Sequence, residues 1–237
     1  MKADLLYEGK AKWVYQTTDK PGHLVLEYKN DATAFNGEKK EVYTGKGRLN
    51  NAISAYIFNA LNEQGIQTHF VEKLSETEQL VRQTEIIPLE VVVRNVAAGS
   101  ITRRLGIETD TPFSPALVEL FYKDDDLGDP LINDAHALFL NKVTKSELQE
   151  IKAKALEINQ QLTKLFEAIN LKLVDFKLEF GRLASGCIVL SDEISPDTCR
   201  LWDTTTNENL DKDVFRQGTG DLLEVYQKLF DRLEART

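Results

Sequence analysis

The segment Leu173-Val-Asp-Phe-Lys-Leu-Glu-Phe-Gly181 alternates strictly between apolar and charged side chains from Val174 to Phe180. Successive side chains of a β-strand point to opposite faces, so the pattern predicts a strand with one apolar and one charged face. The charged face carries Asp175, Lys177 and Glu179. Alternation alone also fits a half-buried strand that turns its polar face to water. The segment that follows helps to decide between the two interpretations.

Cys187-Ile-Val-Leu-Ser-Asp192 has the composition of a second strand, and Arg182 to Gly186 is short enough to turn it back antiparallel to the first. Asp192 would then lie close to Lys177 and Glu179. Carboxylates on adjacent strands suit Mg²⁺, which binds one or two protein oxygens and completes its octahedron with phosphate and water. Lys177 would neutralise charge on a transferring phosphoryl group. These three residues are the candidate catalytic groups, and the two carboxylates are the candidate metal ligands.

The first third of the chain predicts an antiparallel sheet with one helix. Ala11 to Thr17 and His23 to Asn30 alternate in polarity around a turn at Asp19 to Gly22. Apolar residues from Leu49 to Leu61 follow helical spacing, and Gly65 supplies a left-handed stop. Three further strands are expected, at Thr68 to Leu74, Gln79 to Arg82 and Leu89 to Arg94.

Farther along the chain, helices follow the strands. Thr144 and Glu147 have the spacing of a capping box ahead of a long amphipathic pattern that reaches Ile169. Another helical pattern runs from Asp221 to Leu233. Asp124 to Asp129 is the clearest candidate for a mobile loop.

A short glycine-lysine turn lies near the N-terminus. Tyr7-Glu-Gly-Lys-Ala-Lys12 places Gly9 at a strand-to-strand turn beside Lys10 and Lys12. The arrangement is similar to a hairpin that covers phosphates, and it lacks the Gly-Lys-Ser/Thr of a Walker motif. A solvated surface turn is the alternative.

A second candidate anion site follows an apolar strand. Ile86-Ile-Pro-Leu-Glu-Val-Val-Val-Arg94 ends in arginine, and small residues lead from it to Ser100, at the start of a helix expected over Ile101 to Leu105. The planar fork of Arg94 and the hydroxyl and free N–H groups at Ser100 would hold a phosphomonoester. Alternatively, the two residues are a surface arginine and a helix N-cap.

The loop from Ser191 to Asp203 concentrates acidic and basic residues around a proline. Loops of this kind often carry binding groups. Asp197 and Arg200 would grip sugar hydroxyls and a phosphate, or they would form an ion pair that fixes the loop.

Composition excludes several classes of protein. The formal charge of -9 over 237 residues argues against a general nucleic-acid binder, which needs clustered Lys and Arg. We find no charged leader before an apolar segment and no apolar run near the ~18 residues of a membrane span, so we expect a cytoplasmic protein. Two cysteines and three scattered histidines favour neither a disulfide framework nor a zinc site.

With these segments in view, the chain closely resembles the phosphoribosylaminoimidazole-succinocarboxamide synthase family, also called SAICAR synthetase. Ile86 to Ser100 and Leu173 to Gly181 are similar to the two signature stretches of that family. Its other recurrent segments are matched in order by Tyr7 to Lys12, Gly45 to Asn51, Tyr122 to Pro130 and Asp192 to Trp202. The similarity covers essentially the whole chain and is greatest to the form found in many Gram-positive bacteria.

The resemblance implies an α+β, two-lobe fold related to ATP-grasp and protein-kinase architectures, with nucleotide bound between the lobes. The strand pattern predicts the lobe boundary near Glu85. Residues 1–85 would form an antiparallel-sheet N-terminal lobe that covers ATP. Residues 86–237 would form a mixed α/β C-terminal lobe that carries the metal and imidazole-nucleotide sites. A homodimer is also implied.

Roles for individual residues follow from the same resemblance. Lys10 and Lys12 would approach the ATP phosphates, the strand around Arg82 would border the adenine, and Glu179 and Asp192 would hold Mg²⁺. The imidazole nucleotide would be bound by Arg94, Ser100 and Arg200 at its phosphate and by Asp197 at its ribose.

Three residues are candidates for the reacting carboxylate, its metal and the incoming aspartate: Lys177, Lys123 and Asp129. The chain departs from many relatives at one position, where Asn36 replaces an aspartate. Because an amide cannot replace a carboxylate charge, we assign Asn36 no metal role.

The implied reaction is the ATP-dependent condensation of L-aspartate with the carboxylate of 5-amino-1-(5-phosphoribosyl)imidazole-4-carboxylate (CAIR) in de novo purine biosynthesis. The γ-phosphoryl group would pass to that carboxylate, and the aspartate amine would displace phosphate from the acyl phosphate to give SAICAR. Positioning and charge neutralisation dominate such transfers, so no nucleophilic side chain is needed. A small-molecule kinase and a non-catalytic nucleotide-binding module remain alternatives.

Overall fold

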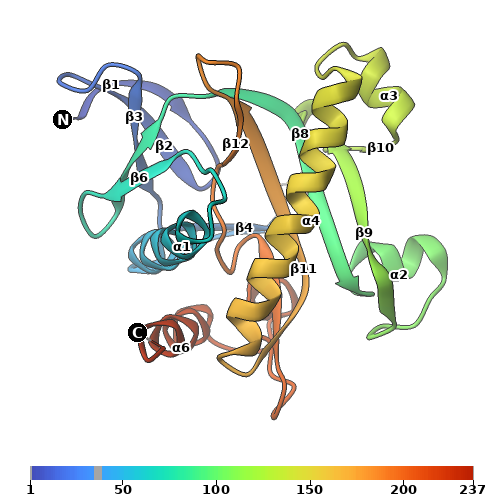
Figure 1. Cartoon of the computed structure of the whole chain (residues 1–237). Helices are drawn as coiled ribbons and strands as arrows, with labels where there is room; N and C mark the ends of the chain where they lie inside the picture. Colours follow the sequence, from blue (N-terminus) through green and yellow to red (C-terminus); the bar gives the residue numbers. More distant parts are fainter. Residues whose placement is uncertain (1, 35–38, 237) are drawn as a thin grey trace.

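The computed structural model describes residues 2–34 and 39–236 of the chain and contains two main sheets (Figure 1). The N-terminal sheet is antiparallel, with five strands in the order β1-β2-β3-β7-β6. Its strands are β1 (Lys2–Glu8), β2 (Lys12–Thr17), β3 (His23–Tyr28), β6 (Phe70–Lys73) and β7 (Glu78–Arg82). A separate two-stranded sheet pairs β4 (Asp31–Ala34) with β5 (Lys39–Val42). Asn36 lies outside the described residues.

The larger sheet has six strands in the order β10-β9-β8-β11-β12, and β13 also pairs with β11. Its strands are β8 (Glu85–Val96), β9 (Pro112–Tyr122), β10 (Leu131–Ile132), β11 (Leu171–Arg182), β12 (Ile188–Ser191) and β13 (Cys199–Asp203). Strand β11 therefore lies between β8 on one side and both β12 and β13 on the other. The expected α+β fold is confirmed.

Helices pack against both main sheets: α1 contacts the N-terminal sheet, and α4 contacts the larger sheet. Figure 1 shows α4 lying across β8 and β11, and α1 beside α6. The α-helices are α1 (Lys46–Glu63), α2 (Ser100–Leu105), α3 (Asp134–Phe139), α4 (Lys145–Glu167), α5 (Asp213–Gln217) and α6 (Leu222–Glu234). A single turn of 3₁₀ helix, η2 (Asp125–Leu127), interrupts the candidate mobile loop. Because α6 packs on α1, the C-terminal helix rests against the N-terminal part of the chain.

Most elements form where the sequence patterns predict them, but β8 is longer than expected. It runs from Glu85 through Pro88 to Val96, whereas the sequence predicted a strand from Leu89 to Arg94 within the apolar run Ile86 to Arg94. The pairing with β11 shifts between Glu90↔Glu179 and Ile86↔Gly181, which places extra residues of β8 at the proline. A bulge of this kind accommodates a residue that has no N–H to donate. The strand therefore continues through Pro88 with a shift in its register.

The charged face of β11 does not face water. Asp175 is 4% exposed and Glu179 is 3% exposed, so the solvent-facing interpretation of the alternation is wrong. On the apolar side, Phe176, Leu178 and Phe180 join the main hydrophobic core, and α4 packs on the strand. The central strand thus buries charged groups as well as apolar ones.

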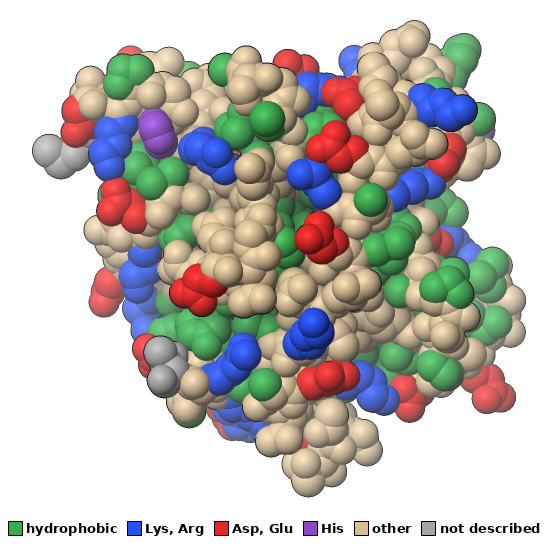
Figure 2. Space-filling view, in the orientation of Figure 1, with side chains coloured by type: hydrophobic (Ala, Val, Ile, Leu, Met, Phe, Trp, Pro, Cys, Tyr) green, Lys and Arg blue, Asp and Glu red, His purple; other side chains and the backbone are tan. Residues whose placement is uncertain are grey.

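Surface charge is distributed without a single-sign patch on the face shown in Figure 2, where basic and acidic side chains are interspersed. Among the described residues, no helix is both long and apolar enough to cross a bilayer.

The predicted capping box begins α4. The Thr144 hydroxyl accepts a bond from the Glu147 N–H at 3.2 Å, and the Glu147 carboxylate accepts one from the Thr144 N–H at 2.7 Å. The other carboxylate oxygen of Glu147 accepts a bond from Arg182 at 2.5 Å. That bond is the main cause that lowers the pKa of Glu147 to about 2. The cap therefore anchors α4 to the end of β11.

We expect Thr144→Ala to lower the free energy of unfolding by about 1 kcal/mol, because the Glu147 N–H loses its acceptor at the helix N-terminus. Urea unfolding followed by circular dichroism measures the change. Gln149→Ala is the matched control, since Gln149 is exposed on the same helix, and it should alter stability by only a few tenths of a kcal/mol. Equal effects from the two substitutions would contradict the capping role.

Candidate functional site

Two adjoining cavities lie between and beside the main sheets. The larger has a volume of about 620 Å³ and is lined by residues of both sheets. The smaller has a volume of about 350 Å³ and extends along β11 toward α5. The two share six lining residues, which are Lys10, Thr33, Glu90, Lys177, Asp197 and Thr198. They therefore form one continuous site with two compartments.

The larger cavity has an apolar wall and a charged wall. Strands β2, β3 and β7 contribute Val14, Leu24, Leu26 and Val81, and β8 contributes Ile86. The same space is lined by Lys10 and Lys12 and by Lys177 and Glu179 of β11. Such a cavity suits a ligand with a flat apolar ring at one end and anionic groups at the other.

The charged wall is built around Glu179. Its two carboxylate oxygens accept bonds from Lys123 Nζ, each at 2.7 Å, and Oε1 also accepts one from Lys177 Nζ at 2.8 Å. Lys177 pairs in addition with Glu90 at 2.8 Å. Burial would lower the pKa of Lys177, but Glu179, Glu90 and Asp192 outweigh it and raise that pKa well above its ordinary value. Lys177 is therefore a cation and not a general base.

Asp192 lies just beyond the end of β12, where Glu179 pairs with Ser191 across the ladder. The predicted antiparallel return is thus confirmed, with β12 beginning at Ile188 rather than Cys187. Asp192 Oδ1 contacts Lys12 Nζ at 2.7 Å. Burial would raise the pKa of Asp192, but three lysines, Lys12, Lys177 and Lys123, together lower it. The carboxylate is therefore ionised and faces cationic neighbours.

Lys12 is largely buried at the start of β2, where its Nζ atom lies 2.5 Å from Glu193 Oε1 as well as 2.7 Å from Asp192. These carboxylates raise the pKa of Lys12 well above its ordinary value although burial would lower it. Lys10 is half exposed and pairs with Asp125 of η2 at 2.7 Å. The solvated-turn alternative is therefore wrong for Lys12, and the Lys10 contact joins the β1-β2 hairpin to the loop after β9.

Two other predicted residues line the larger cavity. Asp129 has a left-handed backbone, with φ of 48°, and its carboxylate accepts a bond from the Asp124 N–H at 2.9 Å. The Arg82 guanidinium donates to the carbonyl oxygen of Thr68. The side chains of Asp129 and Arg82 therefore already form hydrogen bonds within the protein.

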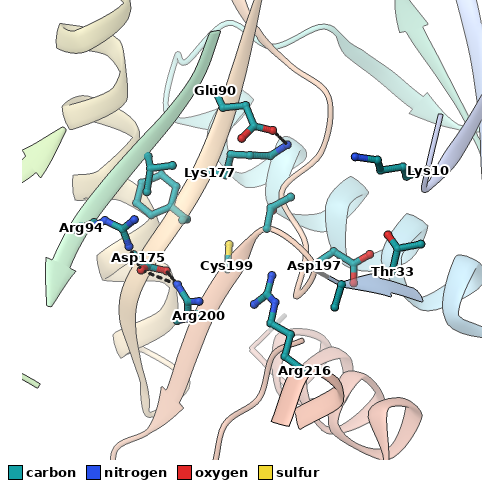
Figure 3. Close-up of a pocket in the computed structure, with 14 residues that line it drawn as sticks. Lys10, Thr33, Glu90, Arg94, Asp175, Lys177, Asp197, Cys199, Arg200 and Arg216 are labelled. Carbon is teal, nitrogen blue, oxygen red and sulfur yellow. Dashed lines mark hydrogen bonds and ion pairs between the residues drawn. The ribbon is translucent and has the colours of Figure 1, made fainter. Parts of the chain in front are cut away.

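The smaller cavity contains a buried arginine cluster. Figure 3 shows Asp175 between Arg94 and Arg200. Asp175 Oδ2 lies 2.5 Å from Arg94 Nη1 and 2.9 Å from Arg200 Nη1. Glu119 contacts Arg94 Nε at 2.6 Å, and Asp213 contacts Arg200 Nε at 2.8 Å. Arg94 is only 3% exposed, so it is not a surface arginine.

The remaining guanidinium nitrogens converge on the turn before α2. Arg94 Nη2 lies 3.5 Å from the hydroxyl of Ser100, the first residue of that helix. A Cβ atom at Gly99 would lie 2.7 Å from Arg200 Nη2, and Gly99 has φ of 65°. The backbone conformation therefore favours glycine here, and a larger residue would also have to displace the Arg200 guanidinium.

Asp197 lies in the wall shared by the two cavities but is held by buried partners. Lys46 Nζ, at the start of α1, contacts it at 2.5 Å, and the Tyr226 hydroxyl of α6 donates to it. Burial would raise the pKa of Asp197, but Lys212 and Lys46 lower it. The alternative of an Asp197–Arg200 ion pair does not hold, because Asp197 pairs with Lys46 and Lys212, whereas Arg200 pairs with Asp175 and Asp213.

Several cavity residues were not identified from the sequence. Glu90 and Asp175 lie on strands that were predicted, and their partners are set by the β8-β11 register, which pairs Glu90 with Glu179 and Asp175 with Arg94. Figure 3 shows Arg216 extending from α5 toward the smaller cavity. Its only sequence signal is its place in a short basic and acidic segment near the C-terminus.

Formal charge distinguishes the two compartments. Six basic and seven acidic side chains line the larger cavity, for a net charge of −1. Five basic and three acidic side chains line the smaller one, for a net charge of +2. A phosphomonoester carries about −2 charges near neutral pH, so the smaller cavity complements it. A polyanion in the larger cavity would need added cations.

The carboxylates of the larger cavity fit a hard divalent cation. Within residues 2–34 and 39–236, no cluster of three or more metal-ligating side chains occurs. Glu179 and Asp192 nevertheless place two carboxylates on one wall beside a space for phosphates. Mg²⁺ takes few protein oxygens when phosphate and water supply the rest, so this donor set fits it.

Comparison with known proteins identifies relatives over the whole chain. A sequence profile described as SAICAR synthetase matches residues 5–233. A phosphoribosylaminoimidazole-succinocarboxamide synthase of Oceanobacillus iheyensis is 66% identical over 99% of both chains. The crystal structure of the synthase of that name from Ehrlichia chaffeensis superposes with a TM-score of 0.95 at 44% identity, covering 98% of this chain and 99% of the other. A SAICAR synthetase in complex with ADP has a TM-score of 0.93 at 46% identity and 96% coverage of each chain.

The arginine cluster generates a prediction that is independent of catalysis. Asp175→Asn should lower the free energy of unfolding by about 3 kcal/mol, because two buried guanidinium groups lose their shared counter-charge. Inorganic phosphate should restore part of this loss by occupying the cluster. Thermal unfolding at increasing phosphate concentration measures both effects.

Asp134→Asn provides the control, since Asp134 forms an exposed ion pair with Lys152 and should contribute less than about 1 kcal/mol. A loss in Asp175→Asn that phosphate leaves unchanged would show that the cluster does not bind anions.

Proposed function

The chain belongs to the SAICAR synthetase family, and on this premise we propose that it is the ATP-dependent ligase that condenses L-aspartate with CAIR to form SAICAR, ADP and phosphate. This is a carbon-nitrogen ligation of de novo purine biosynthesis. The observation that carries the proposal is the pair of adjoining cavities with different charge, which share Lys177 and Glu90 at their junction. Two anionic substrates that must react with each other fit such an arrangement.

ATP would occupy the larger cavity. Its adenine would lie against the apolar wall near Arg82, and its phosphates would lie beside Lys10 and Lys12. The hairpin position of both lysines supports this orientation, because both line the cavity and Lys12 contacts Asp192 at 2.7 Å. Lys10 would leave Asp125 when it binds phosphate.

CAIR would occupy the smaller cavity with its phosphate against Arg94, Arg200 and Ser100. The position of both arginines in the cavity lining supports this placement, as does the approach of Arg94 Nη2 to the Ser100 hydroxyl, at 3.5 Å. Asp197 would accept a ribose hydroxyl. Its present bonds to Lys46 and Tyr226 would hold its carboxylate in a fixed orientation for that contact.

The imidazole carboxylate would then lie near Lys177, at the junction of the cavities. Lys123 and Asp129 are proposed for the region where aspartate enters, because both line the larger cavity close to the η2 loop. Arg216 adds a guanidinium to the lining of the smaller cavity that would attract the carboxylate of CAIR or of aspartate.

Glu179 and Asp192 would hold Mg²⁺ together with the ATP phosphates. When bound, the ion would neutralise phosphate charge and orient the γ-phosphoryl group. The negative net charge of the larger cavity supports a requirement for such a cation. Lys123 and Lys177, which now neutralise Glu179, would remain available to the substrate carboxylates.

The protein contributes position and charge to two steps. In the first, a CAIR carboxylate oxygen attacks the γ-phosphorus, the bond to the ADP oxygen breaks, and an acyl phosphate forms. In the second, the neutral amine of aspartate attacks the acyl carbon, phosphate leaves with the C–O bond electrons, and the nitrogen loses a proton. Lys177 would stabilise the charge on the transferring group in the first step.

Three further features complete the proposal. The lobe boundary would lie at residues 85 and 86, where the larger sheet begins, so residues 1–85 would cover ATP and residues 86–237 would carry the metal and CAIR sites.

The protein would act in the cytoplasm as a homodimer. Sedimentation at the mass of a single chain would contradict the dimer, and recovery in the membrane fraction would contradict the location.

One assay tests the reaction class. ADP release is measured with ATP, Mg²⁺ and CAIR, with and without L-aspartate, and the products are separated by chromatography. We expect stoichiometric SAICAR and ADP only when aspartate is present. A stable phosphorylated product without aspartate would instead identify a small-molecule kinase, and binding without turnover would identify a nucleotide-binding module.

The carboxylate assignment leads to a separate prediction. Glu179→Gln and Asp192→Asn should each reduce turnover by at least about a hundredfold, because each removes a charged oxygen ligand for Mg²⁺. Circular dichroism should show that both variants remain folded. Glu150→Gln, an exposed substitution on α4, is the control and should retain wild-type turnover. Near-normal turnover in both site variants would overturn the assignment.

A further inference from the structure

His69 is a buried histidine between the two sheets. It directly precedes β6, is 4% exposed and lines the larger cavity. Its ring packs edge-on against Phe58 of α1, with centroids 5.5 Å apart. Its Nε2 atom lies 3.1 Å from the carbonyl oxygen of Asp192. The side chain therefore connects the helix of the N-terminal region to a residue at the end of β12.

The backbone around His69 is fixed on both sides. Its N–H donates to the Leu190 carbonyl at 2.7 Å, and its own carbonyl accepts a bond from the Arg82 N–H at 2.7 Å. The Leu190 N–H donates in turn to Gln67 at 3.1 Å. These bonds form a short bridge between the strand segment before β6 and β12. These backbone hydrogen bonds therefore fix the position of the imidazole ring beside Asp192.

Asp192 needs such support because its backbone is left-handed, with φ of 62°. A residue with a Cβ atom reaches this conformation at a cost of roughly 1 kcal/mol or more, and surrounding contacts must select it. The conformation directs the carboxylate toward Lys12, at 2.7 Å. An extended backbone at Asp192 would direct the same carboxylate elsewhere.

The contact also defines the protonation of the ring. A carbonyl oxygen only accepts hydrogen bonds, so Nε2 must carry the proton and donate it. Because Nε2 is a donor engaged with backbone, it is not placed to take a proton from a substrate amine.

We propose that His69 is a positioning residue whose Nε2–H holds the Asp192 carbonyl, and thereby aims the Asp192 carboxylate at the Mg²⁺–nucleotide compartment. The identity of the ligand, Mg²⁺ with a nucleotide, rests on the proposed function. The positioning of Asp192 rests only on the contacts of His69. If the His69 ring only filled space, its shape would matter and its Nε2–H donor would not.

Two substitutions separate these roles. His69→Gln retains an N–H donor that reaches a similar distance from the backbone, whereas His69→Leu retains an apolar side chain without a donor. Phe166→Leu is the control for general destabilisation, because Phe166 is fully buried in α4 and does not line either cavity. All four proteins are compared by thermal unfolding.

The main measurement is calorimetric titration of ADP into each full-length protein at fixed Mg²⁺ concentrations. For His69→Leu, we expect the Mg²⁺ concentration at half-saturation to rise about tenfold, as for loss of a group that orients a metal ligand. His69→Gln and Phe166→Leu should remain close to wild type. A wild-type Mg²⁺ dependence in His69→Leu would overturn the proposal. Equal losses in the Gln and Leu variants would also overturn it, because the donor would then be irrelevant.

A second measurement uses the unsubstituted protein and does not depend on whether His69→Leu folds. Long-range ¹H–¹⁵N spectra of the metal-free protein at neutral pH report which ring nitrogen carries the proton. The proposal requires a proton on Nε2, and protonation at Nδ1 alone would overturn it.

Failure of the proposed function has a different signature. Wild-type protein would then bind Mg²⁺–ADP without converting aspartate and CAIR to SAICAR, while the order of the His69 variants in Mg²⁺-dependent ADP binding would still report on positioning.

Discussion

The fold depends on the pairing of three charges on the central strand β11, of which Asp175 and Glu179 are buried and Lys177 is 26% exposed. One face of this strand packs against α4, and the other face lines the site. The site-facing side carries Asp175, Lys177 and Glu179. Burying an unpaired charge costs several kcal/mol, so each must meet a counter-charge from another element. β8 supplies Arg94 and Glu90 through its register with β11, and the chain after β9 supplies Lys123. The pairing of these strands is thus fixed by charge as well as by apolar packing.

These ion pairs are better explained by ligand binding than by stability. Replacing a buried pair with apolar groups is often neutral or stabilising, so a network of this size is weak evidence for a stability function. Its members line the cavities, and the basic members exceed the acidic ones only in the smaller cavity. The network therefore maintains charged groups in fixed positions, at a cost that bound substrates would offset.

Local patterns predicted the elements well because their causes are local. The alternation of β11, the capping box of α4 and the spacing of α1 each depend on neighbours within a few residues. The partners of the site residues depend on long-range register and could not be read in this way. Lys46 and Asp197 are 151 residues apart, and Lys12 and Glu193 are 181 apart. The bulge at Pro88 and the role of Asp175 between two arginines became visible only once β8 and β11 were paired.

Asp175 also explains how two buried arginines remain able to bind an anion. It uses the Nη1 groups of both Arg94 and Arg200, while Glu119 and Asp213 use the two Nε groups. What remains on each guanidinium is Nη2, and both Nη2 atoms lie at the turn of Gly99 and Ser100. A phosphate arriving at this turn would not have to displace any carboxylate. The carboxylates hold each guanidinium group through Nε and Nη1, so the side chain has little rotational freedom left to lose when a ligand binds. The carboxylates therefore orient the arginines and do not compete with the ligand.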